Sequence, residues 1–255
     1  MKIHLLGTGT STGVPVIGCD CHICGSTDPK NKRFRSSIAV EVDGEFIVID
    51  TGPEFRLQAL RAGITKLKHV LYTHIHADHS QGFDDLRAYS FYDKEPLEVY
   101  LLPDCQQEFH QRFDYAISGN SGYSGAIPKV RMISIPNHEF KVGPILVEPF
   151  RLPHGHVTSC AFRSGKFLYA TDFKSFSENQ IHRLRGKISV MVASGIHFGQ
   201  HHSHSVIPET VRLFERLGVE RGILTHLSHQ VDYRKDDDQL PPGVEFAYDG
   251  MVIDL

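Results

Sequence analysis

Short apolar runs recur along the chain between polar, glycine and proline residues, a pattern that favours strands joined by turns and helices. In the first half the runs predict strands at 2–6, 36–42, 45–50, 69–72 and 97–102 and helices at 53–61, 84–89 and 103–113. In the second half they predict strands at 144–152, 159–163, 166–171, 188–193, 222–225, 244–246 and 251–253 and helices at 177–184 and 207–217. Each half begins with successive strands and later alternates strand with helix. This order predicts an α/β fold of two sheets with helices outside them, a four-layer αββα sandwich.

Turn residues support these boundaries. The dipeptide Asp43-Gly44 predicts a tight hairpin turn, and Gly63 predicts the end of the helix that Pro53 opens. The segment 118–125 is rich in glycine and serine, which predicts a loop. The chain has 255 residues and shows no linker, low-complexity tract or short-period repeat, so we predict a single domain over residues 1–255.

The net charge and the length of the apolar segments limit the kinds of binding partner that we expect for this chain. The formal net charge is −3, and no segment approaches the ~20 apolar residues that span a bilayer. We therefore expect a small substrate, no nucleic acid and no membrane, and we leave a homodimer open. Five cysteines without a visible secretion signal predict a cytoplasmic protein. The 17 histidines are unusually many, and we interpret the excess as metal chemistry.

One heptapeptide carries the strongest chemical signal. Thr73-His74-Ile75-His76-Ala77-Asp78-His79 follows the predicted strand 69–72 and places four candidate ligands within six residues. His74 and His76 project to the same side of an extended chain, and a turn from Ala77 would aim Asp78 and His79 at the same pocket. Imidazole and carboxylate suit zinc, manganese or iron, and a mixed ligand set is typical of catalytic sites.

This heptapeptide resembles the signature of the metallo-β-lactamase superfamily, whose αββα sandwich holds one or two metals between its sheets. The resemblance implies further site residues, each at the end of an apolar strand. Asp50 would orient the metal-binding histidines. Two divalent metals, Zn or Mn, would be held by His74, His76 and His154 and by Asp78, His79 and His226, with Asp172 between them. His156 competes with His154 for its place, and we prefer His154 because it comes first after the strand.

A second cluster lies near the N-terminus. Cys19, Cys21 and Cys24 offer three thiolates, and a tetrahedral zinc site needs a fourth ligand. His22 is nearest, but its reach would be strained. The segments Gly7-Thr8-Gly9, Gly13-Val14-Pro15 and Gly18-Cys19-Asp20-Cys21, together with Leu224-Thr225-His226-Leu227-Ser228-His229-Gln230, resemble the opening and closing motifs of PhnP-type phosphodiesterases. The resemblance implies that His229 completes one structural zinc site. Cys105 and Cys160 fall outside the motifs and are expected in the core.

The same resemblance implies hydrolysis of a small phosphodiester, notably a cyclic ribosyl phosphate, by a hydroxide that bridges the two metals. We assign catalytic roles to Asp78 and to His204, the latter as proton donor to the leaving group, with His201 and His202 as competitors. Arg33 and Arg35 could contact substrate, but we expect them as solvated surface residues.

Three alternatives remain. A ribonuclease Z would carry an inserted basic, glycine-rich arm, which is not evident in the sequence. A thiolesterase of the same fold would not need the cysteine loop. A non-catalytic metal-binding protein would need neither His204 nor Asp172.

Overall fold

The computed structural model describes residues 1–93, 95–118 and 126–255, and in them two seven-stranded mixed sheets account for the strands. The first sheet has the order β14-β1-β2-β3-β4-β5-β6. Its strands are β1 (Lys2–Gly7), β2 (Ser37–Val42), β3 (Glu45–Ile49), β4 (His69–Leu71), β5 (Leu97–Leu101), β6 (Val130–Ser134) and β14 (Val252–Asp254). The second sheet has the order β13-β12-β11-β10-β9-β8-β7. Its strands are β7 (Phe140–Val142), β8 (Ile145–His154), β9 (Val157–Ser164), β10 (Phe167–Ala170), β11 (Val190–Ser194), β12 (Arg221–Thr225) and β13 (Val244–Phe246).

Both sheets change direction in the same way. In the first, β14, β1, β2 and β3 pair antiparallel, and β3, β4, β5 and β6 pair parallel. In the second, β7 to β10 pair antiparallel, and β10 to β13 pair parallel. Parallel strands end at one edge of a sheet, so each sheet gathers the residues that follow its strands at a common edge.

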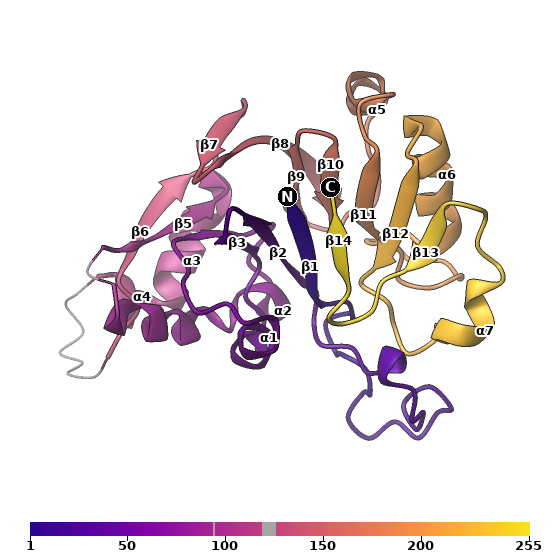
Figure 1. Cartoon of the computed structure of the whole chain (residues 1–255), viewed down its shortest axis with the longest axis horizontal. Helices are drawn as coiled ribbons and strands as arrows, with labels where there is room; N and C mark the ends of the chain where they lie inside the picture. The colour runs from indigo at the N-terminus through magenta and orange to yellow at the C-terminus, as the bar shows by residue number, and fades with distance from the viewer. Residues whose placement is uncertain (94, 119–125) are drawn as a thin grey trace.

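Three apolar cores define four layers. The largest lies between the sheets and joins Ile38 and Ile49 of the first sheet to Phe162, Val192 and Ile223 of the second. A second core packs helices onto the first sheet, and a third packs helices onto the second. The helices of the first sheet are α1 (Phe55–Ala62), η2 (Phe83–Phe91) and α3 (Gln106–Arg112), and those of the second are α5 (Glu178–Leu184) and α6 (Ile207–Leu217). The predicted αββα sandwich is confirmed, and Figure 1 shows its two halves with β1 and β14 between them.

Most predicted elements are present, with differences that have local causes. The predicted helix 84–89 is the 3₁₀ helix η2, and 103–113 divides into η3 (Pro103–Cys105) and α3. The short helices η1 (Pro29–Asn31), α2 (Ala77–Ser80), α4 (Asp114–Ile117) and α7 (Tyr233–Asp237) and the strands β6 and β7 were not predicted. Alternating polar residues in β6 and the three-residue length of β7 leave little apolar pattern to detect. Of the predicted loop 118–125, residues 119–125 lie outside the described residues.

Strand β8 is longer than predicted and contains two prolines. Pro149 and Pro153 pair with β9 on one side, whereas β7 covers only Ile145 to Val147 on the other. Proline is tolerated there because the missing amide would face an unpaired edge. The extension to residue 154 makes His154 the last residue of the strand.

A membrane span is a separate question. Within the described ranges, no helix has both the length and the apolar character that crossing a bilayer requires.

Asp249 joins several segments beside β14, and it gives the fold a testable pH dependence. Its carboxylate accepts hydrogen bonds from the Thr8 hydroxyl and the Phe34 amide, both at 2.8 Å, and lies 3.6 Å from the Arg61 guanidinium. Burial raises the pKa of Asp249 to about 6, above its value in an unfolded chain. The group's contribution to stability is therefore complete below the unfolded pKa and is lost as the pH rises through about 6.

We expect Asp249→Asn to become more stable relative to the parent as the pH rises. Between about pH 5 and about pH 7.5, the difference in free energy of unfolding should shift in favour of the variant by about 1 kcal/mol or more. Urea unfolding of both proteins at matched metal content measures this shift. The exposed variant Asp43→Asn should show no such trend, and a pH-independent difference for Asp249→Asn would contradict the assignment.

Candidate metal centre

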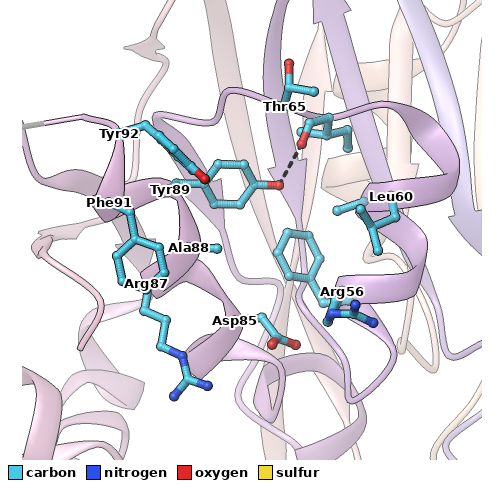
Figure 2. Close-up of a pocket in the computed structure, with 12 residues that line it drawn as sticks. Arg56, Leu60, Thr65, Asp85, Arg87, Ala88, Tyr89, Phe91 and Tyr92 are labelled. Carbon is cyan, nitrogen blue, oxygen red and sulfur yellow. Dashed lines mark hydrogen bonds between the residues drawn. The ribbon is translucent and has the colours of Figure 1, made fainter. Parts of the chain in front are cut away.

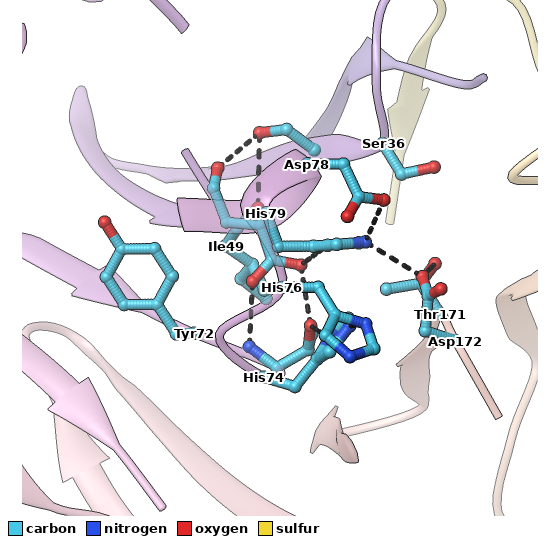
Figure 3. Close-up of polar contacts among 12 residues, drawn as sticks. Ser36, Ile49, Tyr72, His74, His76, Asp78, His79, Thr171 and Asp172 are labelled. Carbon is cyan, nitrogen blue, oxygen red and sulfur yellow. Dashed lines mark hydrogen bonds and ion pairs between the residues drawn. The ribbon is translucent and has the colours of Figure 1, made fainter. Parts of the chain in front are cut away.

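Five chain segments from the two sheets deliver polar side chains to one place. Asp50 follows β3, the segment 73–79 follows β4, His154 ends β8, Asp172 follows β10, and His226 follows β12. The histidines and aspartates of this set are buried apart from His76, which is exposed. Figure 3 shows His74, His76, Asp78 and His79 on one side of this centre and Asp172 with Thr171 on the other. The two sheets thus meet at the edge where their parallel strands end.

The backbone turns sharply at three of these positions. Asp50, Asp172 and His226 have φ values of 67°, 51° and 57°, in the left-handed region that residues other than glycine rarely occupy. Each lies within two residues of a strand end, so the turn redirects its side chain toward the centre. Such strain costs about 1–3 kcal/mol per residue and persists where the surrounding structure holds it, often at functional sites.

One ligand group consists of His74, His76 and His154, whose ligand atoms lie within 4.8 Å of one another. His74 Nε2 is 2.9 Å from His76 Nδ1. His154 Nδ1 donates to the Ser203 carbonyl at 3.2 Å, which leaves Nε2 free to bind a metal. His156, the competitor of His154, is exposed and lies outside these groups.

The other group surrounds Asp172. Asp78, Asp172 and His226 form one compact set, and His74, His79 and Asp172 form another. His79 Nε2 lies 3.2 Å from Asp78 and 3.1 Å from Asp172. Asp172 is common to these sets, so its carboxylate lies between the two groups of ligands.

The charges of this centre fit a bound cation. Burial lowers the pKa of His74, His76 and His226, so their imidazoles are in the neutral form that binds metals. Burial alone would lower the pKa of His79 too, but Asp172, Asp78 and Asp50 raise it well above its usual value. Within the described part of the chain, His79 Nε2 is buried and makes no hydrogen bond. A metal ion would take the place of the proton between this nitrogen and the two carboxylates and would neutralise their charge.

Hydrogen bonds from residues outside the ligand groups orient the candidate ligands. Asp50 accepts from the Thr73 amide and hydroxyl and from His79 Nδ1, each at 2.8 Å. The Ser36 hydroxyl donates to the Gly9 carbonyl at 3.0 Å and lies 3.1 Å from His226 Nδ1. Ser36 and Thr73 did not stand out in the sequence because a single hydroxyl beside a strand has no distinctive pattern.

His204 lies at the open side of the centre. Its Nδ1 is 3.5 Å from Asp172 Oδ1, and its ring centroid is 4.6 Å from that of His154. Burial, and then His226, lowers the pKa of His204 to about 3. His202 is exposed, whereas His201 packs against His204 with ring centroids 4.7 Å apart. Of the three histidines, His204 is the one that reaches Asp172.

The cysteine cluster is also brought together. Cys19, Cys21 and Cys24 place their Sγ atoms 3.3, 3.5 and 3.6 Å from His229 Nδ1. Hydrogen bonding, first from the Cys24 amide, lowers the pKa of Cys21 to about 6, which favours the thiolate. His22 instead lies 3.2 Å from the Asp232 carboxylate. The structure therefore gathers His229, and not His22, with the three cysteines.

The expectation that Arg33 and Arg35 are solvated surface residues is wrong. Arg33 is buried and donates to the carbonyls of Ser228 and Val231 at 2.9 Å, which ties the N-terminal arm, residues 8–35, to the segment after His226. Arg35 is half-buried and pairs with Glu54. Isolated arginines on a sequence give no sign of such burial.

The comparison with protein families decides the relationship. The model described as "Beta-lactamase superfamily domain" matches residues 45–227, which span the candidate site residues from Asp50 to His226. The chain belongs to the β-lactamase superfamily. A solved member, described as "a New Diphosphatase from the PhnP Family", has a TM-score of 0.92 and 33% identity and covers 100% of this chain and 97% of its own. It confirms the predicted resemblance to PhnP-type proteins.

Two curated proteins with different names are also similar to this chain. The protein named Octanoyltransferase of Porphyromonas gingivalis is 35% identical over 255 residues, 98% of this chain and 51% of that protein. A Ribonuclease Z of Methanosarcina mazei is 34% identical over 93 residues, 35% of this chain and 30% of that protein. The chain thus spans about half the length of the first relative and less than a third of the second.

One hollow in the surface lies away from the candidate metal ligands. A hollow of 470 Å³ lies between α1 and η2 and is lined largely by apolar side chains, including Leu60, Tyr89 and Tyr92 (Figure 2). Tyr89 closes one side by donating to the Ile64 carbonyl at 2.9 Å. None of the candidate ligands lines this hollow, so it lies apart from the candidate metal centre.

Proposed function

We propose that this chain is a metal-dependent phosphodiesterase that hydrolyses a small phosphodiester, such as a cyclic ribosyl phosphate. The main support is the position of Asp172, which lies in a strained turn and is shared by three overlapping groups of histidines and aspartates. His74, His76 and His154 would hold one divalent metal, and Asp78, His79 and His226 the other, with Asp172 common to both. Similarity to a PhnP-family diphosphatase favours a phosphorus centre over a lactam.

The metals, when bound, would lower the pKa of water and neutralise charge on the phosphoryl oxygens. The chain's own residues would do the rest. Asp50 holds the imidazole of His79 by its Nδ1, which fixes the direction of Nε2. His204 would give a proton to the leaving alkoxide. The free chain depresses the pKa of His204, and the negative charge of a bound phosphodiester would favour its protonated form.

The cysteine cluster would hold a structural zinc. Three thiolates and one imidazole, with no further ligand beside them among the residues that the structure describes, match a closed tetrahedral zinc site. This zinc would fasten the N-terminal arm to the segment that follows His226.

A hydrolysis screen tests the proposal. Protein with measured metal content is assayed on 2′,3′-cyclic nucleotides, a ribosyl cyclic phosphate, linear diesters, a dinucleoside diphosphate and bis(p-nitrophenyl) phosphate. We expect turnover of small diesters that a chelator abolishes and that Mn²⁺ or Zn²⁺ restores. If metal is present in stoichiometric amounts and no ester turns over, the non-catalytic metal-binding alternative replaces this proposal. Cleavage of a precursor tRNA in preference to small diesters would favour a ribonuclease Z.

A second candidate is thioester hydrolysis. Its support is the relative named Octanoyltransferase, which matches 98% of this chain, although half of that protein lies outside the match. An octanoyl thioester of a small thiol is the appropriate probe in the same screen. Turnover of this thioester without turnover of any phosphodiester would favour the second candidate over the first.

A further inference from the structure

We propose that Lys174 is a positioning residue that holds one loop in place for both a metal ligand and the proton donor. The loop comprises residues 201–204 and is called the histidine loop below. This inference rests on the proposed function, because it assigns Lys174 to the same centre. Lys174 makes no contact with the candidate metal ligands through its ammonium group and acts through the loop.

The ammonium group of Lys174 joins the two ends of the histidine loop. Its Nζ donates to the His201 carbonyl at 3.0 Å and to the His204 carbonyl at 3.3 Å. It also pairs with Glu209 at 2.9 Å. The second Glu209 oxygen lies at 3.1 Å, so four acceptor atoms on three groups surround the ammonium and its three donors are fully used.

The histidine loop in turn orients the centre. The Ser203 carbonyl accepts from His154 Nδ1 at 3.2 Å, which directs the other nitrogen of His154 toward its ligand group. His204 is the last residue of the loop and reaches Asp172. A displacement of this loop would therefore disturb His154 and His204 together.

Backbone hydrogen bonds also join the segment around Lys174 to the residues beside the histidine loop and beside His154. The Lys174 amide donates to the Pro153 carbonyl at 2.7 Å, next to His154, and the Ser205 amide donates to the Phe173 carbonyl at 2.6 Å. Inside the loop, His201 Nδ1 lies 3.3 Å and 3.2 Å from the amides of Ser203 and His204 and accepts from them. These backbone hydrogen bonds do not involve the Lys174 side chain. A variant of that side chain should therefore keep the fold and make only the histidine loop more mobile.

Glu209, the counter-ion of Lys174, is itself held in place by a hydrogen bond. Glu209 lies in the first turn of α6 and also accepts from the Val206 amide at 3.3 Å. The pair is about one-third exposed, at 34% for Lys174 and 36% for Glu209, so its direct effect on stability is small. The Lys174–Glu209 pair instead fixes the position of the ammonium group, because it directs this group toward the two carbonyls.

The test compares leaving groups. Lys174→Met and its matched control Lys166→Met, an exposed lysine in the turn after β9, are assayed on bis(p-nitrophenyl) phosphate and on a diester with an alkoxide leaving group. p-Nitrophenolate leaves without a proton, whereas an alkoxide needs one. We expect Lys174→Met to lower kcat for the alkoxide substrate about 10- to 100-fold and for the nitrophenyl substrate several-fold less. KM and the melting temperature should change little.

Metal affinity gives a second readout that needs no turnover. Titration against a competing chelator should show one metal equivalent bound about 10-fold more weakly in Lys174→Met, because His154 loses its orienting carbonyl. Equal losses of kcat on both substrates, or unchanged affinity and unchanged kcat, would overturn the inference. If the parent protein hydrolyses no phosphodiester, the proposed function fails, and the affinity measurement still decides whether Lys174 positions His154.

Discussion

Replacing Asp172 with asparagine is expected to abolish phosphodiester hydrolysis, with kcat reduced by about 10³-fold or more. Asp172 is shared by three groups of candidate ligands, and no other described residue has that place. Asparagine has the same shape and tolerates the left-handed backbone at φ 51°, so the variant removes charge without changing the turn. The Thr171 hydroxyl, which donates to Asp172 at 2.7 Å, would retain an acceptor.

The measurement for Asp172→Asn combines steady-state kinetics with metal content per chain. Both kcat and the number of bound metal ions should fall. The matched control is Asp43→Asn, because Asp43 has the same φ of 51° in an exposed hairpin turn and lies far from the ligands in the sequence. A variant at position 172 that keeps its activity and its metal would refute the shared-ligand assignment.

Replacing Cys21 with serine is expected to remove one zinc per chain and to lower the melting temperature by roughly 10 °C. The cluster joins the N-terminal arm to His229, and a small core of Val14, Ile23 and Cys24 packs around it. Without zinc, the three thiols and the imidazole would have no common partner to hold the arm in place. His229→Ala should give the same result, because it removes the fourth ligand.

Zinc analysis and thermal unfolding check this second prediction. Cys105→Ser is the control, since Cys105 is also a free, half-buried cysteine but lies outside the cluster. It should retain all bound metal. If Cys21→Ser and His229→Ala also retain all their zinc, the cluster is not a zinc site.

The ligand set could be predicted because its members are chemically distinctive and end apolar strands. The segment 73–79 combines a buried strand with four ligands, and His154, Asp172 and His226 each follow a run whose apolar character is visible in the sequence. Helix α6 was predicted at its observed bounds since Ile207, Leu213 and Leu217 form one buried face, with Pro208 in the first turn and Gly218 directly after the last residue.

The remaining features depend on contacts between distant residues. The choice of His204 over His201 and His202 depends on how the loop folds against Asp172. The burial of Arg33 depends on carbonyls nearly 200 residues away, at Ser228 and Val231. A Cβ at Gly7 would lie 2.0 Å from the Arg35 carbonyl, so close backbone packing requires this glycine. Local patterns carry no information about such neighbours.

The pairing of the first and last segments constrains how the protein can be made in the cell. Cys24 and His229 are 205 positions apart, and β1 pairs with β14 through Lys2 and Asp254. During translation, the first strand and the cysteine loop therefore leave the ribosome long before their partners do. Three thiols would remain in an open loop, exposed to oxidation and to other metals, until His229 emerges. If the cluster is a zinc site, the metal can close it only after His229 has left the ribosome.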